Sequence, residues 1–247
     1  MRLYGFSYSP YVAKVRKCLE LKGIPFDYAE VPYLDRRELV AVTGGTVHVP
    51  VLADGPTVVT DSARITAWLD DRHAPSLRAD PAAVVYEGWA DNVLEDVAFR
   101  VATPGLEARF AELQGGRADA GALFRLVKER KFGPGCVDAW RRDAAALTAR
   151  TLELLEPAAR AVAARPFLLG DRPSLADAAV FGQLAMLEVA FPGWVTRNAP
   201  ALSAWQARVA AAKGVPIPAR QARAPERQAS SGIRKGGTRR PSTSVKR

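Results

Sequence analysis

Sulfur and imidazole are scarce in this chain of 247 residues, which has two cysteines, two histidines and two methionines. Cys18 and Cys136 lie far apart, neither belongs to a Cys-x-x-Cys pair, and the two histidines do not cluster. Structural zinc sites need such clusters, so we expect no metal site. Two isolated thiols in a chain of this size are typical of reduced, structural cysteines.

Long apolar segments are also missing, although 48% of the residues are hydrophobic. No apolar run approaches the roughly 20 residues that span a bilayer, so we expect no membrane association. Arg2 is followed by a short strand-like run rather than by the long apolar segment of a signal peptide. The sequence therefore predicts a cytoplasmic protein.

Acidic residues are almost absent from the C-terminal end. From Lys213 onward there are ten basic residues and one acidic residue, Glu226, so this end carries the whole formal net charge of +9. Its composition, rich in Pro, Ser, Gly, Arg and Gln, predicts a basic disordered tail over 214–247. Such a tail would contact polyanions weakly, and the rest of the chain is close to neutral.

The first third of the sequence alternates between strand and helix patterns. Strands are predicted at 1–6, 25–31, 49–55 and 56–60, and helices at 9–23, 34–42 and 61–72. The Asp-Gly pair between the last two strands indicates a hairpin. The order β-α-β-α-β-β-α predicts an α/β domain over 1–75.

The remainder is helical and rich in alanine, and it follows a Pro-rich polar segment. Apolar residues at helical spacing predict helices at 82–102, 120–133, 137–165, 174–191 and 200–214. No strand pattern occurs after residue 75. We therefore predict an all-helical domain over 81–213, in which the bend at Gly133-Pro134-Gly135 has no chemical interpretation.

Three short motifs stand out, and each has a purely structural interpretation. Ser9 followed by Pro10 is typical of a helix N-cap with proline at the first helical position. The Val49-Pro50 pair opens a strand, where proline is otherwise found at sheet edges. Asp61-Ser62 begins the third helix, as an ordinary cap would.

A fourth motif lies in the helical half. Ser174 and Asp177 form an S-x-x-D pattern at the start of an apolar helix, which is typical of a capping box. Replacing Asp177 by Ala should cost on the order of 1 kcal/mol or more because the cap is lost. This motif indicates a structural role and carries no information on a substrate.

Taken together, the element order and the four motifs resemble the soluble glutathione transferases over residues 1–212. The resemblance is to a serine-type, bacterial-like member of the family. It implies an N-terminal thioredoxin-like domain of βαβαββα order followed by an all-α domain. It also implies a homodimer with glutathione as co-substrate.

The resemblance assigns roles to individual residues. Ser9 would donate a hydrogen bond to the glutathione thiolate at a helix N-terminus, where anions are stabilised. The neighbours Ser7 and Tyr8 remain alternatives for this role. Pro50 would be cis, and Val49 would pair with the cysteinyl backbone of glutathione.

Three further residues complete the expected glutathione site. Asp61 and Ser62 would bind the γ-glutamyl group, with the serine on its carboxylate and the acid near its ammonium. His48 lies where many family members carry a Lys or Gln that meets the glycyl carboxylate; histidine is only partly charged at pH 7, so a surface role is the alternative.

The predicted activity is conjugation of glutathione to a hydrophobic electrophile, bound between the domains. Tyr86, Trp89 and Phe99 are candidates for its pocket, with burial in the core as the alternative. Two other functions remain open: a non-catalytic binding or assembly module, and a glutathione-dependent isomerase. Disulfide exchange needs a thiol at position 9, and Cys18 lies about two and a half helical turns away.

Overall fold

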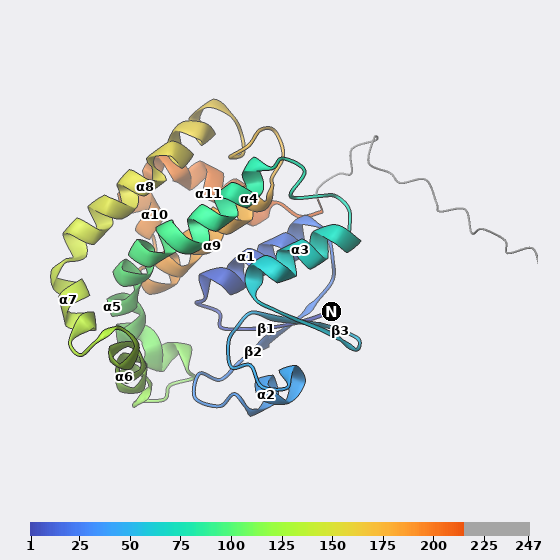
Figure 1. Ribbon diagram of the computed structural model, residues 1–247. Helices are drawn as coiled ribbons and strands as arrows, with labels where there is room; N and C mark the ends of the chain where they lie inside the picture. Colours follow the sequence, from blue (N-terminus) through green and yellow to red (C-terminus); the bar gives the residue numbers. More distant parts are fainter. Residues whose placement is uncertain (215–247) are drawn as a thin grey trace, which may run out of the picture.

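The computed structural model describes residues 1–214. The predicted disordered tail lies outside the described residues, apart from Gly214. The described part consists of a small α/β domain and a larger helical domain, packed side by side (Figure 1). This arrangement is the predicted thioredoxin-like domain followed by a helical one.

The first domain has the predicted order of elements. Its strands are β1 (Arg2–Gly5), β2 (Asp27–Glu30), β3 (Val51–Asp54) and β4 (Thr57–Thr60). Its helices are α1 (Pro10–Leu21), α2 (Arg37–Thr43) and α3 (Ser62–Arg72). Six of the seven elements lie within the predicted ranges, because strand and helix periodicities alternate cleanly in this part of the sequence. Helix α2 ends at Thr43, one residue beyond its predicted range of 34–42.

The four strands form one mixed sheet in the order β2-β1-β3-β4. β1 pairs parallel with β2 and antiparallel with β3, and β3 and β4 form the predicted antiparallel hairpin. Helices α1 and α3 cover one face of the sheet and α2 lies on the other (Figure 1). A buried cluster that includes Leu3, Val15 and Ile65 fills the space under α1 and α3.

The second domain is helical throughout its described part. Its α-helices are α4 (Ala82–Trp89), α5 (Glu95–Leu113), α6 (Ala120–Phe132), α7 (Cys136–Arg142), α8 (Ala144–Ala164), α9 (Leu175–Ala190), α10 (Trp194–Asn198) and α11 (Ser203–Ala211). A 3-10 turn at Pro200–Leu202 precedes α11. None of the helices formed by residues 1–214 is both long and apolar enough to cross a bilayer.

Two predicted long helices are interrupted. The helix expected at 82–102 contains a π-helical turn at Ala90–Leu94 between α4 and α5. The helix expected at 137–165 is divided between α7 and α8 at Asp143. The hydrophobic periodicity of a long segment does not reveal a local break such as one π-helical turn. The sequence therefore predicts each of these two segments as one continuous helix.

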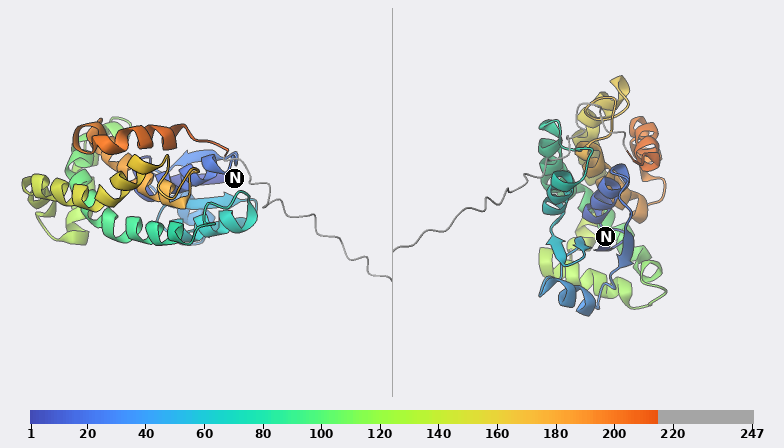
Figure 2. Two further views of the ribbon diagram at one scale, coloured as in Figure 1. Left: turned by 90° about the horizontal axis from the view of Figure 1, so that it is seen from above. Right: turned by 90° about the vertical axis from the view of Figure 1, so that its right-hand side faces the viewer.

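Helix α9 is the centre of the second domain and also meets the first. Seen from above, α9 and α1 lie between α4 on one side and α11 on the other (Figure 2). Gly182 permits the close crossing of α9 over α1, because a Cβ atom at this position would overlap the carbonyl oxygen of Pro10. The crossing therefore fixes the N-terminus of α1 against the helical domain.

The predicted capping box at the start of α9 is present. The Asp177 carboxylate accepts the backbone N–H and the hydroxyl of Ser174, both at 2.9 Å. It also accepts the backbone N–H of Leu168 and the indole N–H of Trp205, each at 2.9 Å. Burial raises the pKa of Asp177, while these donors favour its charged form. The carboxylate thus ties three segments together, which is more than a cap.

Candidate functional site

Ser9 is the N-cap of α1. Its backbone is extended, with φ −80° and ψ 126°, and its Oγ accepts the backbone N–H of Val12 at 3.4 Å. Ser9 as a whole is 8% exposed, so its hydroxyl lies in a confined space. The cap interpretation of Ser9 is therefore correct, and the hydroxyl keeps one hydrogen to donate.

The first turn of α1 offers few other donors. Pro10 at the first helical position has no N–H, and the N–H of Val12 is taken by Ser9. The N–H groups of a first turn have no acceptor within their own helix. This leaves the N–H of Tyr11 for an anion, next to the Ser9 hydroxyl and at the positive end of the helix dipole.

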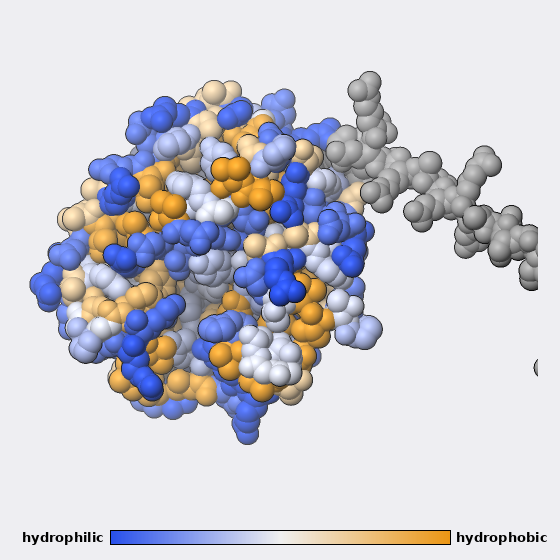
Figure 3. All heavy atoms as spheres, viewed as in Figure 1, coloured by the Kyte–Doolittle hydropathy of each residue, from blue (hydrophilic) through white to orange (hydrophobic). Residues whose placement is uncertain are grey.

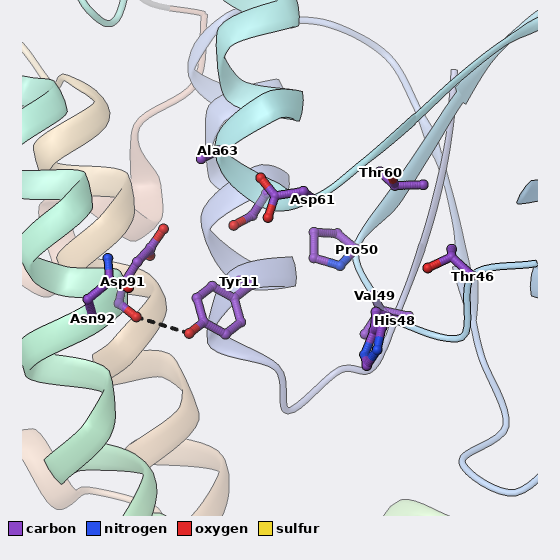
Figure 4. A pocket seen from close by; sticks show the side chains of 11 residues that line it. Tyr11, Thr46, His48, Val49, Pro50, Thr60, Asp61, Ala63, Asp91 and Asn92 are labelled. Carbon is purple, nitrogen blue, oxygen red and sulfur yellow. Dashed lines mark hydrogen bonds between the residues drawn. The ribbon is translucent and has the colours of Figure 1, made fainter.

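A cavity of about 480 Å³, here called the first cavity, lies beside α1 (Figure 4). The five residues predicted to bind glutathione all line it: His48, Val49, Pro50, Asp61 and Ser62. They come from the approach to β3 and from the start of α3. The Val49–Pro50 peptide bond is cis, as predicted.

Asp61 has an unusual backbone. Its φ is +73°, and it is the one non-glycine residue with positive φ within residues 1–214. Its Oδ1 accepts the backbone N–H of Arg64 at 3.0 Å and caps α3. Positive φ in a non-glycine residue is held by the surrounding structure and is found most often at functional sites. Asp61 and the buried Ser62 face the first cavity from the N-terminus of α3.

The opposite wall of the first cavity comes from the second domain, and its residues are not among those predicted from the sequence. Asp91 and Asn92 lie there, in the π-helical turn. The Tyr11 hydroxyl donates to the backbone carbonyl of Asp91 at 3.0 Å and bridges the two domains across the cavity (Figure 4). A π turn is a frequent feature of functional sites, but a single sequence does not reveal one.

A buried ion-pair network holds Asp91 in place. Lys14 of α1 is 1% exposed, and its Nζ donates to Glu87 Oε1 at 2.9 Å and to Asp91 Oδ2. Glu87 also accepts the hydroxyl of Thr66 at 2.9 Å. Asp91 Oδ1 is buried, and no group of residues 1–214 forms a hydrogen bond with it. Burial raises the pKa of Asp91, and Lys14 opposes this shift.

A second cavity of about 340 Å³ adjoins the first and shares Tyr11, His48 and Val49 with it. Ser9 and Tyr8 line this second cavity, not the first. The space-filling view shows the surface hollowed between the two domains (Figure 3). The Ser9 hydroxyl therefore lies in the second cavity, at its boundary with the first.

The alternatives to Ser9 are separated by their positions. Ser7 is exposed, lines neither cavity, and its backbone N–H donates to the Glu30 carboxylate at 3.1 Å. Tyr8 is 7% exposed, and its hydroxyl has no hydrogen-bond partner. Burial raises the pKa of Tyr8 far above its usual value, so this hydroxyl stays protonated.

The three aromatic candidates for the electrophile pocket also differ in whether they line a cavity. Phe99 lines the second cavity, as predicted for the electrophile pocket. Tyr86 and Trp89 line neither cavity; they contact each other edge to face and pack against the core cluster. For these two residues the core interpretation holds, because they lie on α4, before the π turn that begins the cavity wall.

The two thiols do not take part in either cavity. Cys18 is 1% exposed, and burial raises its pKa to about 12. Burial also raises the pKa of Cys136, at the start of α7. Within residues 1–214, no group of three or more His, Cys, Asp or Glu side chains is placed to hold a metal ion. A protein thiolate is thus not available for disulfide exchange at the site.

Models for the two domains of one protein family match the chain. The model described as "Glutathione S-transferase, N-terminal domain" matches residues 3–77, and "Glutathione S-transferase, C-terminal domain" matches residues 138–208. These matches together span more than half of the chain. The chain belongs to the glutathione S-transferase family.

Its similarity to individual family members is low in sequence and clear in fold. A probable glutathione S-transferase of rice (Oryza sativa subsp. japonica) is 27% identical over 237 residues, which cover 87% of each chain. A glutathione S-transferase structure from Rhodospirillum rubrum has 22% identity and a TM-score of 0.64, and the match covers 87% of this chain and 89% of that one. A glutathione S-transferase of Ceriporiopsis subvermispora, solved in complex with glutathione, has 19% identity and a TM-score of 0.64, with 85% and 94% covered.

Proposed function

We propose that this glutathione transferase family member binds glutathione in the first cavity and conjugates its sulfur to an electrophile held in the second. One observation carries the proposal. All five residues predicted for glutathione line one cavity, and that cavity shares Tyr11, His48 and Val49 with a second one in which Ser9 lies. The proposed glutathione site and the proposed electrophile site thus meet beside the N-terminus of α1.

The γ-glutamyl end of glutathione would lie at the start of α3. Ser62 and the N-terminal N–H groups of α3 take its carboxylate, since a helix N-terminus favours an anion. Its ammonium lies near Asp61 and near Asp91, whose buried Oδ1 has no hydrogen-bond partner among residues 1–214. Asp91 is an addition to the residues that the sequence predicts.

The rest of the tripeptide would extend toward α1. Val49 pairs with the cysteinyl backbone through its own N–H and C=O, and His48 lies near the glycyl carboxylate. Ser9 donates to the sulfur, which also meets the positive end of the α1 dipole. Tyr8 is the alternative donor, because its protonated hydroxyl has no hydrogen-bond partner in the described part of the chain.

Catalysis would rest on two effects. Stabilising the thiolate increases the fraction of ionised glutathione near neutral pH, because a helix N-terminus and a hydroxyl donor both favour the anion. Holding sulfur and electrophile in adjoining cavities replaces a bimolecular encounter by a local one. The protein supplies neither the nucleophile nor a redox-active thiol.

The alternatives are not favoured by the site. Glutathione-dependent isomerisation needs only the thiolate and would use the same two cavities. A pure assembly module would not need a cavity that gathers Asp61, Asp91 and Ser62. We also propose a homodimer in the cytoplasm; exposed Val85, at 72%, and Val84 on α4 are compatible with a partner subunit.

A substrate panel with three variants tests the proposal. Ser9→Ala should lower the conjugation rate by at least about tenfold, the loss of one charge-assisted hydrogen bond. Tyr8→Phe should keep most of the activity, and Ser9→Cys should gain thiol-transfer activity. Full conjugation by Ser9→Ala together with loss in Tyr8→Phe would move the donor to Tyr8. No detectable binding at millimolar glutathione would overturn the function itself.

A further inference from the structure

The second cavity carries cations that no carboxylate neutralises. Arg36, Lys128 and Lys131 line it, and within residues 1–214 none of them has a carboxylate oxygen within 4.0 Å of its side-chain nitrogens. Arg100 lines the same cavity but is paired with Asp96 at 2.7 Å. Three cations without a carboxylate beside them thus line the same cavity.

Each of these three cations lies over an aromatic ring. Lys128 Nζ is 4.5 Å from the ring centre of Phe124 and 5.0 Å from that of Phe99. The Arg36 guanidinium is 4.8 Å from the ring of Phe6. Cation–π contacts hold a charge in position without neutralising it, so the charges remain available to a ligand.

The position of Lys131 follows from the unexplained bend. Its Nζ is 4.9 Å from the ring of Phe132, the last residue of α6. Gly133 and Gly135 then adopt positive φ, +100° and +75°, and turn the chain into α7. The bend thus ends α6 at the rim, where Lys131 faces the second cavity.

The aromatic floor of the second cavity also contains the unpartnered Tyr8 hydroxyl. Tyr8 stacks on Phe6 at 5.3 Å and meets Phe124 edge to face at 6.4 Å. A buried hydroxyl without a partner costs free energy, which an acceptor on a ligand would recover. A buried donor, an aromatic floor and three unneutralised cations are together complementary to an aromatic molecule that carries a negative charge.

The acids of the second cavity do not cancel this charge. Asp96 is engaged by Arg100, and Glu95 is the remaining carboxylate of the lining. Burial raises the pKa of Glu95 to about 6, so at pH 7 it is mostly ionised and sets one negative charge against the three cations, which leaves a positive excess. Around Lys128 the facing charged groups are Lys131, Arg36, Glu95 and the Cys136 thiol, and burial lowers the Lys128 pKa to about 8.

We propose that the second cavity takes an aromatic electrophile that carries an anionic group, with Lys128 and Arg36 on the anion and the aromatic rings on its apolar body. The predicted hydrophobic electrophile is thereby restricted to an anionic class. The conjugation reaction in this inference rests on the proposed function, whereas the binding of an anion in the second cavity does not. When the electrophile is an aryl chloride, the glutathione thiolate forms a C–S bond to the ring carbon that carries the chlorine. The C–Cl bond breaks, and chloride leaves with the electron pair.

Binding of two unreactive probes tests the charge preference without turnover. Dinitrobenzoate and its neutral amide have the same ring and nearly the same size, and neither carries a leaving chloride. Calorimetry on the full chain should show at least about tenfold tighter binding of the benzoate, the effect of one charge-assisted hydrogen bond. Lys128→Met, which keeps an apolar stem over the two rings, should clearly reduce this preference, because Arg36 and Lys131 remain, and should leave amide affinity unchanged.

Two controls separate local from general effects. Lys213→Gln removes the same charge near the opposite end of α1, where Gly214 contacts Glu20, and should change neither affinity. Lys131→Gln should weaken benzoate binding less than Lys128→Met does, because Lys131 is exposed. Equal affinity for the two probes, or an unchanged preference in Lys128→Met, would overturn the inference.

The outcome for the reaction is measured separately. Chlorodinitrobenzoate should be conjugated with a lower KM than chlorodinitrobenzamide, after correction for the uncatalysed rates, and Lys128→Met should raise only the KM of the acid. If the probes show the preference while glutathione fails to bind, the proposed function is wrong and the anion site stands. If both chlorides are conjugated with equal KM, the function stands and the anion site is wrong.

Discussion

The first and second cavities are adjacent but present charges of opposite sign. The first shows carboxylates to its ligand, Asp61 and the unpartnered oxygen of Asp91. The second shows the cations Arg36, Lys128 and Lys131 over aromatic rings. On this difference we base the proposal that the first cavity selects a ligand with a free ammonium and the second selects an anion.

The two cavities also differ in how they are built. The first uses two consecutive segments of the small domain, around 46–50 and 60–63, and adds one turn of the helical domain. The second gathers residues from four separate places: the segment 6–11 between β1 and the start of α1, the segment before α2, and the helices α5 and α6. A site made of two local motifs is easier to recognise in a sequence than one assembled from four distant elements.

Lys14→Met should have the largest effect, because it removes the cation that holds Glu87 and Asp91 at the wall of the first cavity. Breaking a buried ion pair by deleting one partner costs about 3 kcal/mol or more. Urea denaturation should show this loss of unfolding free energy. Arg16→Met, on an exposed pair with Glu20 in the same helix, should change it by less than about 1 kcal/mol. Equal stability of the two variants would contradict the role of Lys14.

Asp61→Asn should affect one cavity and not the other. Asparagine keeps an oxygen for the Arg64 N–H and tolerates positive φ, so α3 should stay capped. Glutathione affinity should fall about tenfold because the charge facing the ammonium is lost. Dinitrobenzoate affinity should not fall. Asp80→Asn is the matched control, since Asp80 contacts the backbone N–H of Ala82 and lines neither cavity.

The pH dependence of probe binding should sharpen the contrast. Lys128 is charged below its pKa of about 8 and neutral above it, so dinitrobenzoate affinity should fall several-fold between about pH 7 and pH 9. Glu95, with a pKa of about 6, stays ionised throughout this range. Amide affinity should stay flat, and Lys128→Met should flatten the benzoate curve. A curve of the same slope in the variant would mean that another group is titrating.

His48→Gln should have the smallest effect. His48 lines both cavities and is exposed, and glutamine keeps a side-chain N–H donor for the glycyl carboxylate, so little of this one contact is lost. Glutathione affinity should change by no more than about threefold, consistent with a bond of under 1 kcal/mol. Calorimetry at pH 7 measures it. A loss of tenfold or more would make His48 a principal ligand of the first cavity.

The first domain and its motifs could be predicted because their signals are local. Strand and helix periods, the Asp-Gly turn and the cap at Ser9 are each set by a few adjacent residues. Val49-Pro50 and Asp61-Ser62 are predictable for the same reason, and they lie together on the first cavity. The capping box at Ser174 and Asp177 is also local and present.

The remainder depends on contacts between distant residues. The π turn that carries Asp91 is a small distortion within a helical pattern, and the buried Lys14 would ordinarily be placed on the surface. Trp205 reaches Asp177 from 28 residues away, and nothing near either residue indicates the contact. Lys128 looks like part of an ordinary charged helix face until the fold brings the Phe99 ring of α5 beneath it.

The ionisation of bound glutathione tests the central claim most directly, since the thiolate absorbs in the near ultraviolet and its protonated form does not. We predict that glutathione bound to the full chain ionises at least about one pH unit below a free thiol, whose pKa is about 8.5, and that Ser9→Ala returns most of this shift. The Ser9→Ala variant should still bind glutathione through the first cavity. Bound glutathione that ionises like the free thiol, or with the same shift in the native chain and in Ser9→Ala, would contradict the account.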